Sequence, residues 1–154
     1  MKNSRTNTRR YPERPIIGVG ALILNRGRIL LVERGNKPLK GYWSLPGGVV
    51  EAGETLDHAI RREVLEETGL QVEPLGVLEI FERIMPDAKG VAEYHYVLID
   101  YVCRVIAGTV CAGDDVSRVA WVKQSSLADY RITEGTVPVI EKAFRNRKKY
   151  AIQR

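Results

Sequence analysis

The chain has 154 residues, 44% of them hydrophobic, which is enough for one globular domain with a substantial core and requires no second domain. Its net charge of +5 resides at the two ends, within residues 1–15 and 142–154, and the remainder is net negative, which disfavours nucleic acid as a partner. The sequence has no apolar run of membrane-spanning length and no signal peptide, so we expect a cytoplasmic protein without a membrane partner.

The first residues lack hydrophobic periodicity and precede a predicted pair of strands. We expect a disordered basic tail over 1–15, a folded domain over 16–149 and a short second tail over 150–154. Alternating apolar residues predict strands at 16–25 and 28–34, joined by a tight Asn-Arg-Gly turn.

A loop rich in Gly, Pro and Lys is expected at 35–42. Arg34 ends the preceding strand beside this loop, where its guanidinium is placed to bind a phosphate or a base. An exposed ion pair with Glu33 or another acid is the alternative. Trp43 follows the loop. Its indole either stacks on a substrate base or anchors the core, and the sequence leaves both interpretations open.

A helix is predicted from about Leu56, with Thr55 as its N-cap and Gly69 as its end. At 100° per residue one face collects the following side chains: Leu56, Ala59, Ile60, Glu63, Glu66 and Glu67. The early turns of this face are apolar and suit packing, whereas buried carboxylates need a cation to neutralise them. Oxygen ligands indicate Mg²⁺, with Mn²⁺ as a substitute. The alternative is a solvated acidic helix that pairs with Arg61 and Arg62.

Two glycines precede this helix. Gly47 and Gly48 lack side chains where the backbone turns toward the helix, so the Gly47 carbonyl can approach a cation closely and Gly48 leaves room for substrate. A plain turn is the alternative.

Further strands and helices are expected along the rest of the chain. Their ranges are a strand pair or one long bent strand at 71–83, a loop at 85–91, strands at 92–105 and 116–122, a short helical turn at 125–129 and a helix at 136–149. The strand at 92–105 is apolar on both faces, interrupted by Asp100 and Arg104. This pattern is typical of a central strand that is covered on both sides, as in an α/β/α sandwich.

The stretch Gly48–Leu70 resembles the signature of the Nudix hydrolase family. The residues that match the pattern of this Nudix box are Gly48, Glu54, Arg62, Glu63, Val64, Glu66, Glu67, Gly69 and Leu70. The resemblance implies an α/β/α sandwich with a mixed central sheet and a helix that carries metal ions at a diphosphate. It also implies hydrolysis of a nucleoside diphosphate linked to another moiety.

Within this resemblance, Glu63 and Glu67 are expected as the principal metal ligands. Glu66 is expected as a further ligand, and the Gly47 carbonyl as a supporting one. Arg62 lies at the edge of the face and is expected to orient a neighbouring carboxylate. Members of the family commonly draw a general base from a loop outside the helix.

Asp115 lies at a similar distance before Trp121 as such an acid does in related chains. We therefore expect Asp115 as the base, with Asp114, Glu93 and Glu134 as alternatives. A turn shaped by both aspartates is the interpretation without a catalytic role.

The surroundings of the box and the strand Tyr94–Leu98 look like those of small ADP-ribose pyrophosphatases. The resemblance therefore favours ADP-ribose or an ADP-sugar as substrate, cleaved to AMP and a sugar phosphate. A pyrophosphohydrolase that removes (d)NTPs or 8-oxo-dGTP is the alternative within the enzyme class, and a non-catalytic nucleotide-binding regulator is the alternative outside it. The sequence leaves open whether the chain forms a homodimer.

Overall fold

The structure, a computed structural model, describes residues 9–113 and 115–150. In this part of the chain the elements are β1 (Ile16–Asn25), β2 (Arg28–Arg34), β3 (Trp43–Ser44), β4 (Gly47–Val49), α1 (Leu56–Thr68), β5 (Leu70–Pro86), β6 (Ala92–Gly108), β7 (Val116–Lys123), the 3₁₀ helix η1 (Gln124–Asp129) and α2 (Thr136–Arg145). The expected elements are therefore present, in the expected order.

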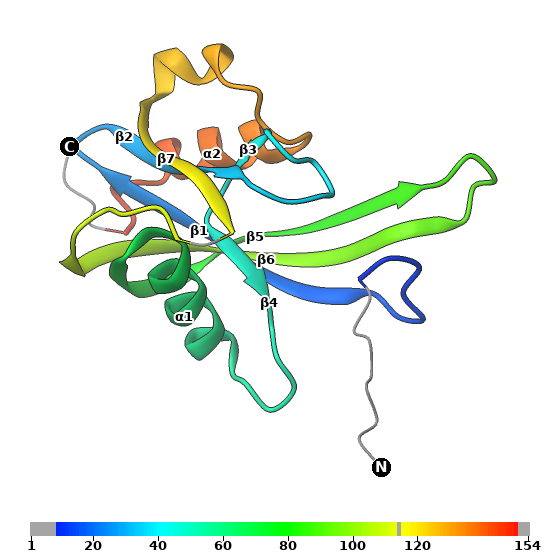
Figure 1. The fold of residues 1–154 in the computed structure, drawn as a ribbon. Coiled ribbons are helices and arrows are strands. Elements are labelled where there is room, and N and C mark those ends of the chain that lie inside the picture. The colour runs from blue at the N-terminus through cyan, green and yellow to red at the C-terminus, as the bar shows by residue number, and fades with distance from the viewer. Residues whose placement is uncertain (1–8, 114, 151–154) are drawn as a thin grey trace.

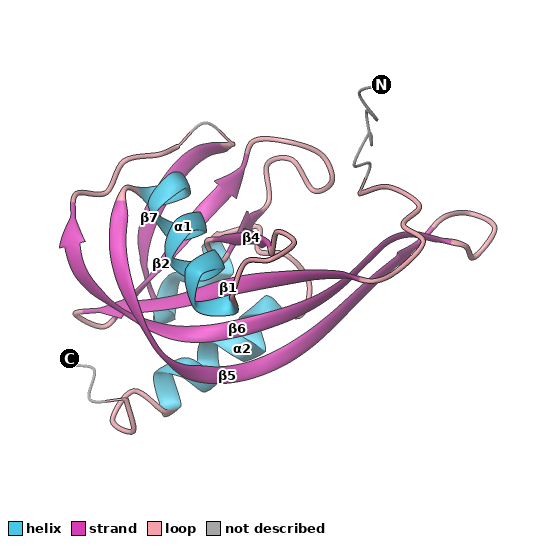
Figure 2. Ribbon diagram, turned by 90° about the horizontal axis from the view of Figure 1, so that it is seen from below, coloured by secondary structure: helices cyan, strands magenta, loops and turns pink. Residues whose placement is uncertain are grey.

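The strands form a mixed sheet in the order β3-β2-β1-β6-β5, with β4 added to β1 and β7 to β2. β1 and β6 run parallel, and the other pairs are antiparallel. Helices α1 and α2 lie on opposite sides of this sheet (Figures 1 and 2). This arrangement confirms the predicted α/β/α sandwich.

The alternation of side chains along β1 divides the core into two halves. Val19, Ala21 and Ile23 belong to the cluster that packs against α1. Leu22 and Leu24 belong to the cluster that packs against α2. Successive side chains of a strand point to opposite faces, so one buried strand serves both layers. Each fully buried aliphatic side chain contributes about 1.5–3 kcal/mol of transfer free energy.

Helix α1 begins and ends at the residues predicted from the sequence. The Thr55 hydroxyl accepts a hydrogen bond from the His58 N–H at 3.1 Å, and Gly69 ends the helix in the left-handed region at φ 74°. Ala59, Ile60 and Val64 are completely buried. The buried stripe thus includes Val64, which rotates the inward face slightly away from Glu66.

Four details differ from the sequence-based expectation. The short strands β3 and β4 were not expected. β5 is the one long bent strand of the two expected alternatives, but it extends to Pro86, with four register shifts against β6 that let it bend. α2 ends at Arg145 rather than Lys149, because residues 145–149 supply no apolar side chain for the core. Strand β6 lies second from the edge of the sheet rather than at its centre, and its buried residues are Asp100, Val102 and Cys103.

The chain is already attached to the sheet before Ile16. The Tyr11 N–H donates to the Glu93 carbonyl at 2.7 Å, and Arg10 pairs with the Glu93 carboxylate at 2.6 Å. The expected tail over 1–15 therefore includes residues that contact β6, whereas residues 1–8 lie outside the described part of the chain. Residues 151–154 of the expected second tail also lie outside it.

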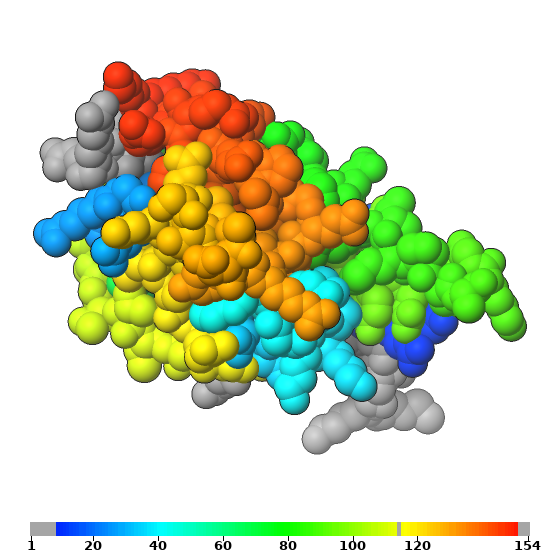
Figure 3. Space-filling model, turned by 90° about the horizontal axis from the view of Figure 1, so that it is seen from above, coloured from blue at the N-terminus to red at the C-terminus, as the bar shows by residue number. Residues whose placement is uncertain are grey.

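β5 and β6 continue beyond the rest of the sheet as a long hairpin (Figure 1). In the space-filling view this hairpin, in green, projects past the orange and red residues of the C-terminal part (Figure 3). No helix among the described residues is long and apolar enough to cross a membrane.

Candidate active site

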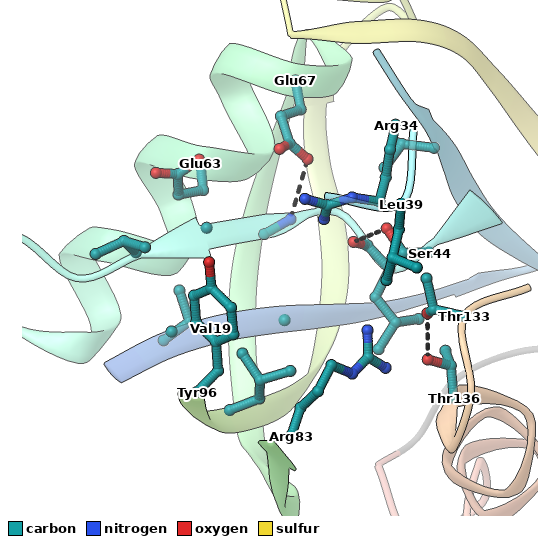
Figure 4. A pocket seen from close by; sticks show the side chains of 18 of the residues that line it. Val19, Arg34, Leu39, Ser44, Glu63, Glu67, Arg83, Tyr96, Thr133 and Thr136 are labelled. Carbon is teal, nitrogen blue, oxygen red and sulfur yellow. Dashed lines mark hydrogen bonds between the residues drawn. The ribbon is translucent and has the colours of Figure 1, made fainter. Parts of the chain in front are cut away.

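A cavity of about 520 Å³ opens beside α1. It is lined by residues of α1, β4, β1 and β2, by the loop at 35–42, by the C-terminal part of β5 and the first half of β6, and by residues between 133 and 139. Glu63 and Glu67 lie toward one end, and Arg83, Thr133 and Thr136 lie toward the other (Figure 4). The sheet and both layers of the sandwich therefore contribute to one site.

Glu67 is the most strongly perturbed acid in the cavity. Its carboxylate accepts a hydrogen bond from the Gly47 N–H at 3.0 Å (Figure 4). Burial raises the pKa of Glu67 to about 8, and the negative charge of Glu63 acts in the same direction. The single backbone hydrogen bond is too weak to offset this desolvation, so a cation at this position would stabilise the ionised form.

Glu63 lies one helical turn before Glu67, and its side chain is only 15% exposed. Burial raises its pKa as well. Gly48 lies directly against it, because a Cβ on Gly48 would be 2.4 Å from the Glu63 carboxylate. The second glycine of the Gly-Gly pair is therefore needed to make room for this acid.

Glu66 lies at the rim of the cavity rather than inside it. Its side chain is 58% exposed and accepts a hydrogen bond from Arg62 Nη1 at 3.2 Å. The sequence places three carboxylates on one face, but the structure turns only Glu63 and Glu67 inward. A ligand role for Glu66 stays a prediction.

Arg62 connects the helix to the segment before it. Its Nε and Nη2 donate to the two Glu54 oxygens at 2.6 and 2.8 Å, and Nη1 donates to Glu63 at 2.8 Å. Arg62 also holds the pKa of Glu54 at about 2, well below its usual range. The guanidinium thus orients Glu63 through a fixed network, which fits the expected positioning role.

Arg34 enters the cavity from the end of β2. Its Nε donates to the Pro38 carbonyl at 2.9 Å, and burial lowers its pKa. The alternative of an ion pair with Glu33 or another acid is not found among the described residues, because Glu33 pairs with Arg118 and no described carboxylate pairs with Arg34. The positive charge of Arg34 acts on Glu67 instead.

Trp43 is part of the core. Its side chain is 7% exposed, its ring meets Tyr130 edge to face at 5.1 Å between centroids, and it does not line the cavity. The structure therefore supports the interpretation of Trp43 as a packed anchor, and stacking on a substrate base is not retained.

Asp115 lines the cavity at the start of β7. It is exposed, accepts a hydrogen bond from Asn36 Nδ2 at 3.1 Å, and its charge contributes to the raised pKa of Glu67. Glu93 pairs with Arg10, and neither Glu93 nor Glu134 lines the cavity. Asp114 lies outside the described residues. Of the described candidates for the base, Asp115 is the one near the inward carboxylates.

The donor groups at this end fit a divalent ion. Among residues 9–113 and 115–150, no three His, Cys, Asp or Glu side chains are gathered closely enough to hold a metal as placed. Glu63 and Glu67 nevertheless supply the carboxylate oxygens that Mg²⁺ and Mn²⁺ prefer, and their raised pKa values reflect a need for positive charge. Gly47 contributes its N–H to Glu67, and the role of its carbonyl as a ligand stays a prediction.

Sequence reasoning missed the other end of the cavity. Arg83 of β5 and Asp100 of β6 line it. The available signal was Asp100, an acid that interrupts an apolar stretch of its strand. The pattern marked it as an interruption, but it could not show that the side chain faces the same cavity as the helix.

Comparisons with known proteins agree with the fold and the motif. A profile described as NUDIX domain matches residues 14–143. An ADP-ribose pyrophosphatase of Methanocaldococcus jannaschii is 36% identical over 113 residues, which cover 73% of this chain and 64% of the relative. The chain thus matches slightly less than two thirds of that relative's length.

Two further proteins are similar over most of their own lengths. A nucleoside triphosphatase NudI of Enterobacter sp. (strain 638) is 33% identical over 75% of this chain and 86% of the relative. The crystal structure of a MutT NUDIX hydrolase from Burkholderia pseudomallei superposes with a TM-score of 0.75, at 30% identity, over 84% of this chain and 98% of that one.

Proposed function

This chain belongs to the NUDIX domain family, and on that premise we propose that it is a Mg²⁺-dependent hydrolase of phosphoric anhydrides. Its substrate would be a nucleoside diphosphate joined to a second group. The proposal rests on the pair of inward carboxylates, Glu63 and Glu67. Burial raises the pKa of both, and the buried guanidinium of Arg34 lies in the same cavity.

This combination of charges suits a diphosphate. Carboxylates alone would repel the anion, so a divalent ion between Glu63, Glu67 and the phosphates is needed to neutralise both. When bound, such an ion polarises the phosphoryl oxygens and stabilises the charge that develops in the transition state. Arg34 supplies positive charge from the opposite side. No carboxylate of the described residues pairs with its guanidinium, which leaves it available to a phosphate.

The remaining residues of this end have supporting roles in the proposal. Arg62 holds Glu63 in position through its bonds to Glu54. Asp115 accepts the proton of the attacking water, because it is the exposed acid near Glu67 that is not held by the helix network. Glu66, at the rim, contributes as an outer ligand.

For the substrate we favour ADP-ribose or an ADP-sugar, cleaved to AMP and a sugar phosphate. Support comes from the similarity to the ADP-ribose pyrophosphatase of Methanocaldococcus jannaschii. The similarity to a nucleoside triphosphatase NudI supports a second candidate, a pyrophosphohydrolase of (d)NTPs or 8-oxo-dGTP. A regulator that binds a nucleotide without turnover is the third alternative.

One substrate panel separates these functions. The wild-type protein is incubated with Mg²⁺ and ADP-ribose, ADP-glucose, dGTP or 8-oxo-dGTP, and AMP, phosphate and pyrophosphate are measured. We expect the highest kcat/KM for ADP-ribose or ADP-glucose. A highest value for 8-oxo-dGTP would favour the second candidate, and tight binding without any product would favour a regulator.

A pair of variants tests the role of the acids. Glu63→Gln and Glu67→Gln each remove a ligand charge at little change in volume, so each should lower kcat about a hundredfold or more at saturating Mg²⁺. Turnover near the wild-type value in both variants would contradict the assignment of the metal-binding end.

A further inference from the structure

Asp100 is a buried acid in the middle of β6 that the proposed chemistry does not use. Its residue surface is only 5% exposed, yet it lines the cavity. Within the described part of the chain, no hydrogen bond or ion pair reaches its carboxylate, and burial raises its pKa to about 6. No fully buried side-chain oxygen of the described residues lacks a partner, so the Asp100 oxygens keep some access to the cavity, from which a ligand can reach them.

The neighbouring strand makes room for this carboxylate. A Cβ on Gly20 of β1 would lie 2.3 Å from Asp100 Oδ1, and 3.6 Å from a methyl carbon of Leu45. Any side chain at position 20 would therefore displace the acid from its place. The absence of a side chain at Gly20 therefore leaves the space in the cavity wall that Asp100 occupies.

Arg83 faces the same end of the cavity from β5 (Figure 4). Its Nη2 donates to the Glu134 carbonyl at 2.6 Å, which holds the side chain in place. Its charge acts on Asp100, but in the described residues the two groups are too far apart to form an ion pair. A hydrogen-bond donor and an acceptor therefore border one space without contacting each other.

The charged groups follow one another along the cavity. Arg34 acts electrostatically on Glu67 at the acidic end and on Arg83 at the other, and Arg83 in turn acts on Asp100. If the diphosphate lies between Glu67 and Arg34, as the proposed function has it, a group attached to the diphosphate reaches Arg83 and Asp100. This step rests on that proposed function.

The chemistry of this end favours hydroxyl groups over a nucleobase. A hydroxyl donates one hydrogen bond and accepts another, which matches an acceptor beside a donor. A base would need a free aromatic face, and the aromatic side chains among the described lining residues are Phe81 and Tyr96. Arg83 lies over the Phe81 ring at 5.5 Å from its centroid, and Gly135 packs against that ring. The Tyr96 hydroxyl points toward the end of Glu63 (Figure 4).

We propose that Asp100 and Arg83 bind the hydroxyl groups of a sugar joined to the diphosphate, with the carboxylate as acceptor and the guanidinium as donor. Both the nucleoside ribose and the second sugar of an ADP-sugar carry such hydroxyls. The pair would therefore make the enzyme select substrates by their sugar, whereas the acidic end acts on any diphosphate.

The test compares Asp100→Asn with the matched control Glu82→Gln. Glu82 is an exposed acid of β5 that does not line the cavity, so the same change from carboxylate to carboxamide is made outside the proposed subsite. Kinetics are measured with ADP-ribose, with 2′-deoxy-ADP-ribose, with the methyl ester of ADP and with the inosine analogue of ADP-ribose. Thermal unfolding establishes that each variant is folded, and Arg83→Gln is measured in parallel as a second variant of the pair.

We expect Asp100→Asn to raise the KM for ADP-ribose about ten- to hundredfold, the usual effect of losing hydrogen bonds to a charged group, with kcat changed less than about threefold. Glu82→Gln should leave both constants within about twofold. If the rise in KM caused by Asp100→Asn disappears with the methyl ester, Asp100 contacts the second sugar. If it disappears with the 2′-deoxy compound, Asp100 contacts the nucleoside ribose. The proposal is overturned if Asp100→Asn raises the KM equally for all four compounds or for none of them. It is also overturned if the rise in KM is lost only with the inosine analogue.

A binding measurement separates this proposal from the proposed hydrolysis. If the wild-type protein cleaves none of the compounds, titration calorimetry with ADP-ribose in the presence of Mg²⁺ still reports on the subsite. Weaker binding by at least about tenfold in Asp100→Asn, but not in Glu82→Gln, would support the sugar subsite although the hydrolase proposal had failed. Equal affinities of the two variants would overturn it.

Discussion

Replacing Glu67 by glutamine should stabilise the metal-free protein at alkaline pH. In the folded chain burial raises the pKa of Glu67 to about 8, from its ordinary value of 4.5. The folded state therefore binds more protons than the unfolded state between these values, so stability falls as pH rises from 4.5 to 8 and stays reduced above pH 8. Glutamine remains uncharged throughout and still offers an oxygen to the Gly47 N–H, so it avoids this loss.

The size of the effect follows from the shift. One pKa unit corresponds to about 1.4 kcal/mol, so the full displacement sets an upper limit of about 5 kcal/mol above pH 8. Structural relaxation and water entry reduce this figure, and we expect Glu67→Gln to be about 2–4 kcal/mol more stable than wild type at pH 9 in EDTA. At pH 5 the difference should be within about 1 kcal/mol, because both side chains are then mostly uncharged in the folded state.

The assay is urea unfolding at pH 5, 7 and 9 in EDTA, followed by circular dichroism. Glu66→Gln is the matched control, since it makes the same substitution at a side chain that is 58% exposed, where removing the charge should change stability by less than about 1 kcal/mol. At pH 9 in saturating Mg²⁺ the wild type should instead be more stable than Glu67→Gln, because the ion binds to and stabilises the wild-type site. If the free energy of unfolding of wild type and of Glu67→Gln depends on pH in the same way in EDTA, burial does not raise the pKa of this carboxylate and the reasoning fails.

Three further predictions concern the neighbouring residues. Arg62→Ala should lower kcat at least about tenfold and destabilise the fold by about 1–3 kcal/mol, because it leaves Glu54 without its two charged hydrogen bonds. If this variant kept the wild-type kcat and urea midpoint, Arg62 would not be a positioning residue for Glu63. Asp115→Asn should lower kcat about a hundredfold at saturating substrate, whereas Asp114→Asn should have a small effect, and equal small effects would remove Asp115 as the base. Arg34→Ala should raise KM for ADP-ribose about tenfold or more with kcat little changed, and a loss confined to kcat would show that Arg34 acts in the transition state alone.

Local sequence signals were sufficient for the longer strands and helices, including the helix that bears the acids, but not for the short strands β3 and β4. Thr55 and Gly69 favour cap positions because of their own side-chain and backbone properties, so the limits of the helix could be predicted from the local sequence alone. The inward direction of Glu63 and Glu67 likewise follows from the periodicity of 3.6 residues per turn. The end of α2 was less predictable, since the turn after Arg145 depends on where the core ceases to offer apolar contacts.

Where two interpretations of one residue remained, packing decided between them. Trp43 is compatible by sequence with stacking or with anchoring, and the position of Tyr130 beside its ring places it in the core. Glu33 was an available partner for Arg34, but it forms an ion pair with Arg118 of β7, and the Arg34 side chain lies in the cavity instead. In both cases the deciding residue is distant in sequence, so no local pattern contained the answer.

By itself the sequence determined the sandwich, the motif helix, the two inward acids and the family, because each depends on short-range periodicity, capping or a fixed spacing. Only the tertiary structure turned Glu66 to the rim, brought Asp115 close to Glu67 and set Asp100 and Arg83 in the same cavity. The shared position of Asp100 and Arg83 requires the pairing of β6 with β5 and the parallel pairing of β1 with β6, which joins segments about eighty residues apart and brings Gly20 opposite Asp100. A contact of that kind arises from the packing of the whole sheet, and the residues on either side of it carry no local signal of their partner.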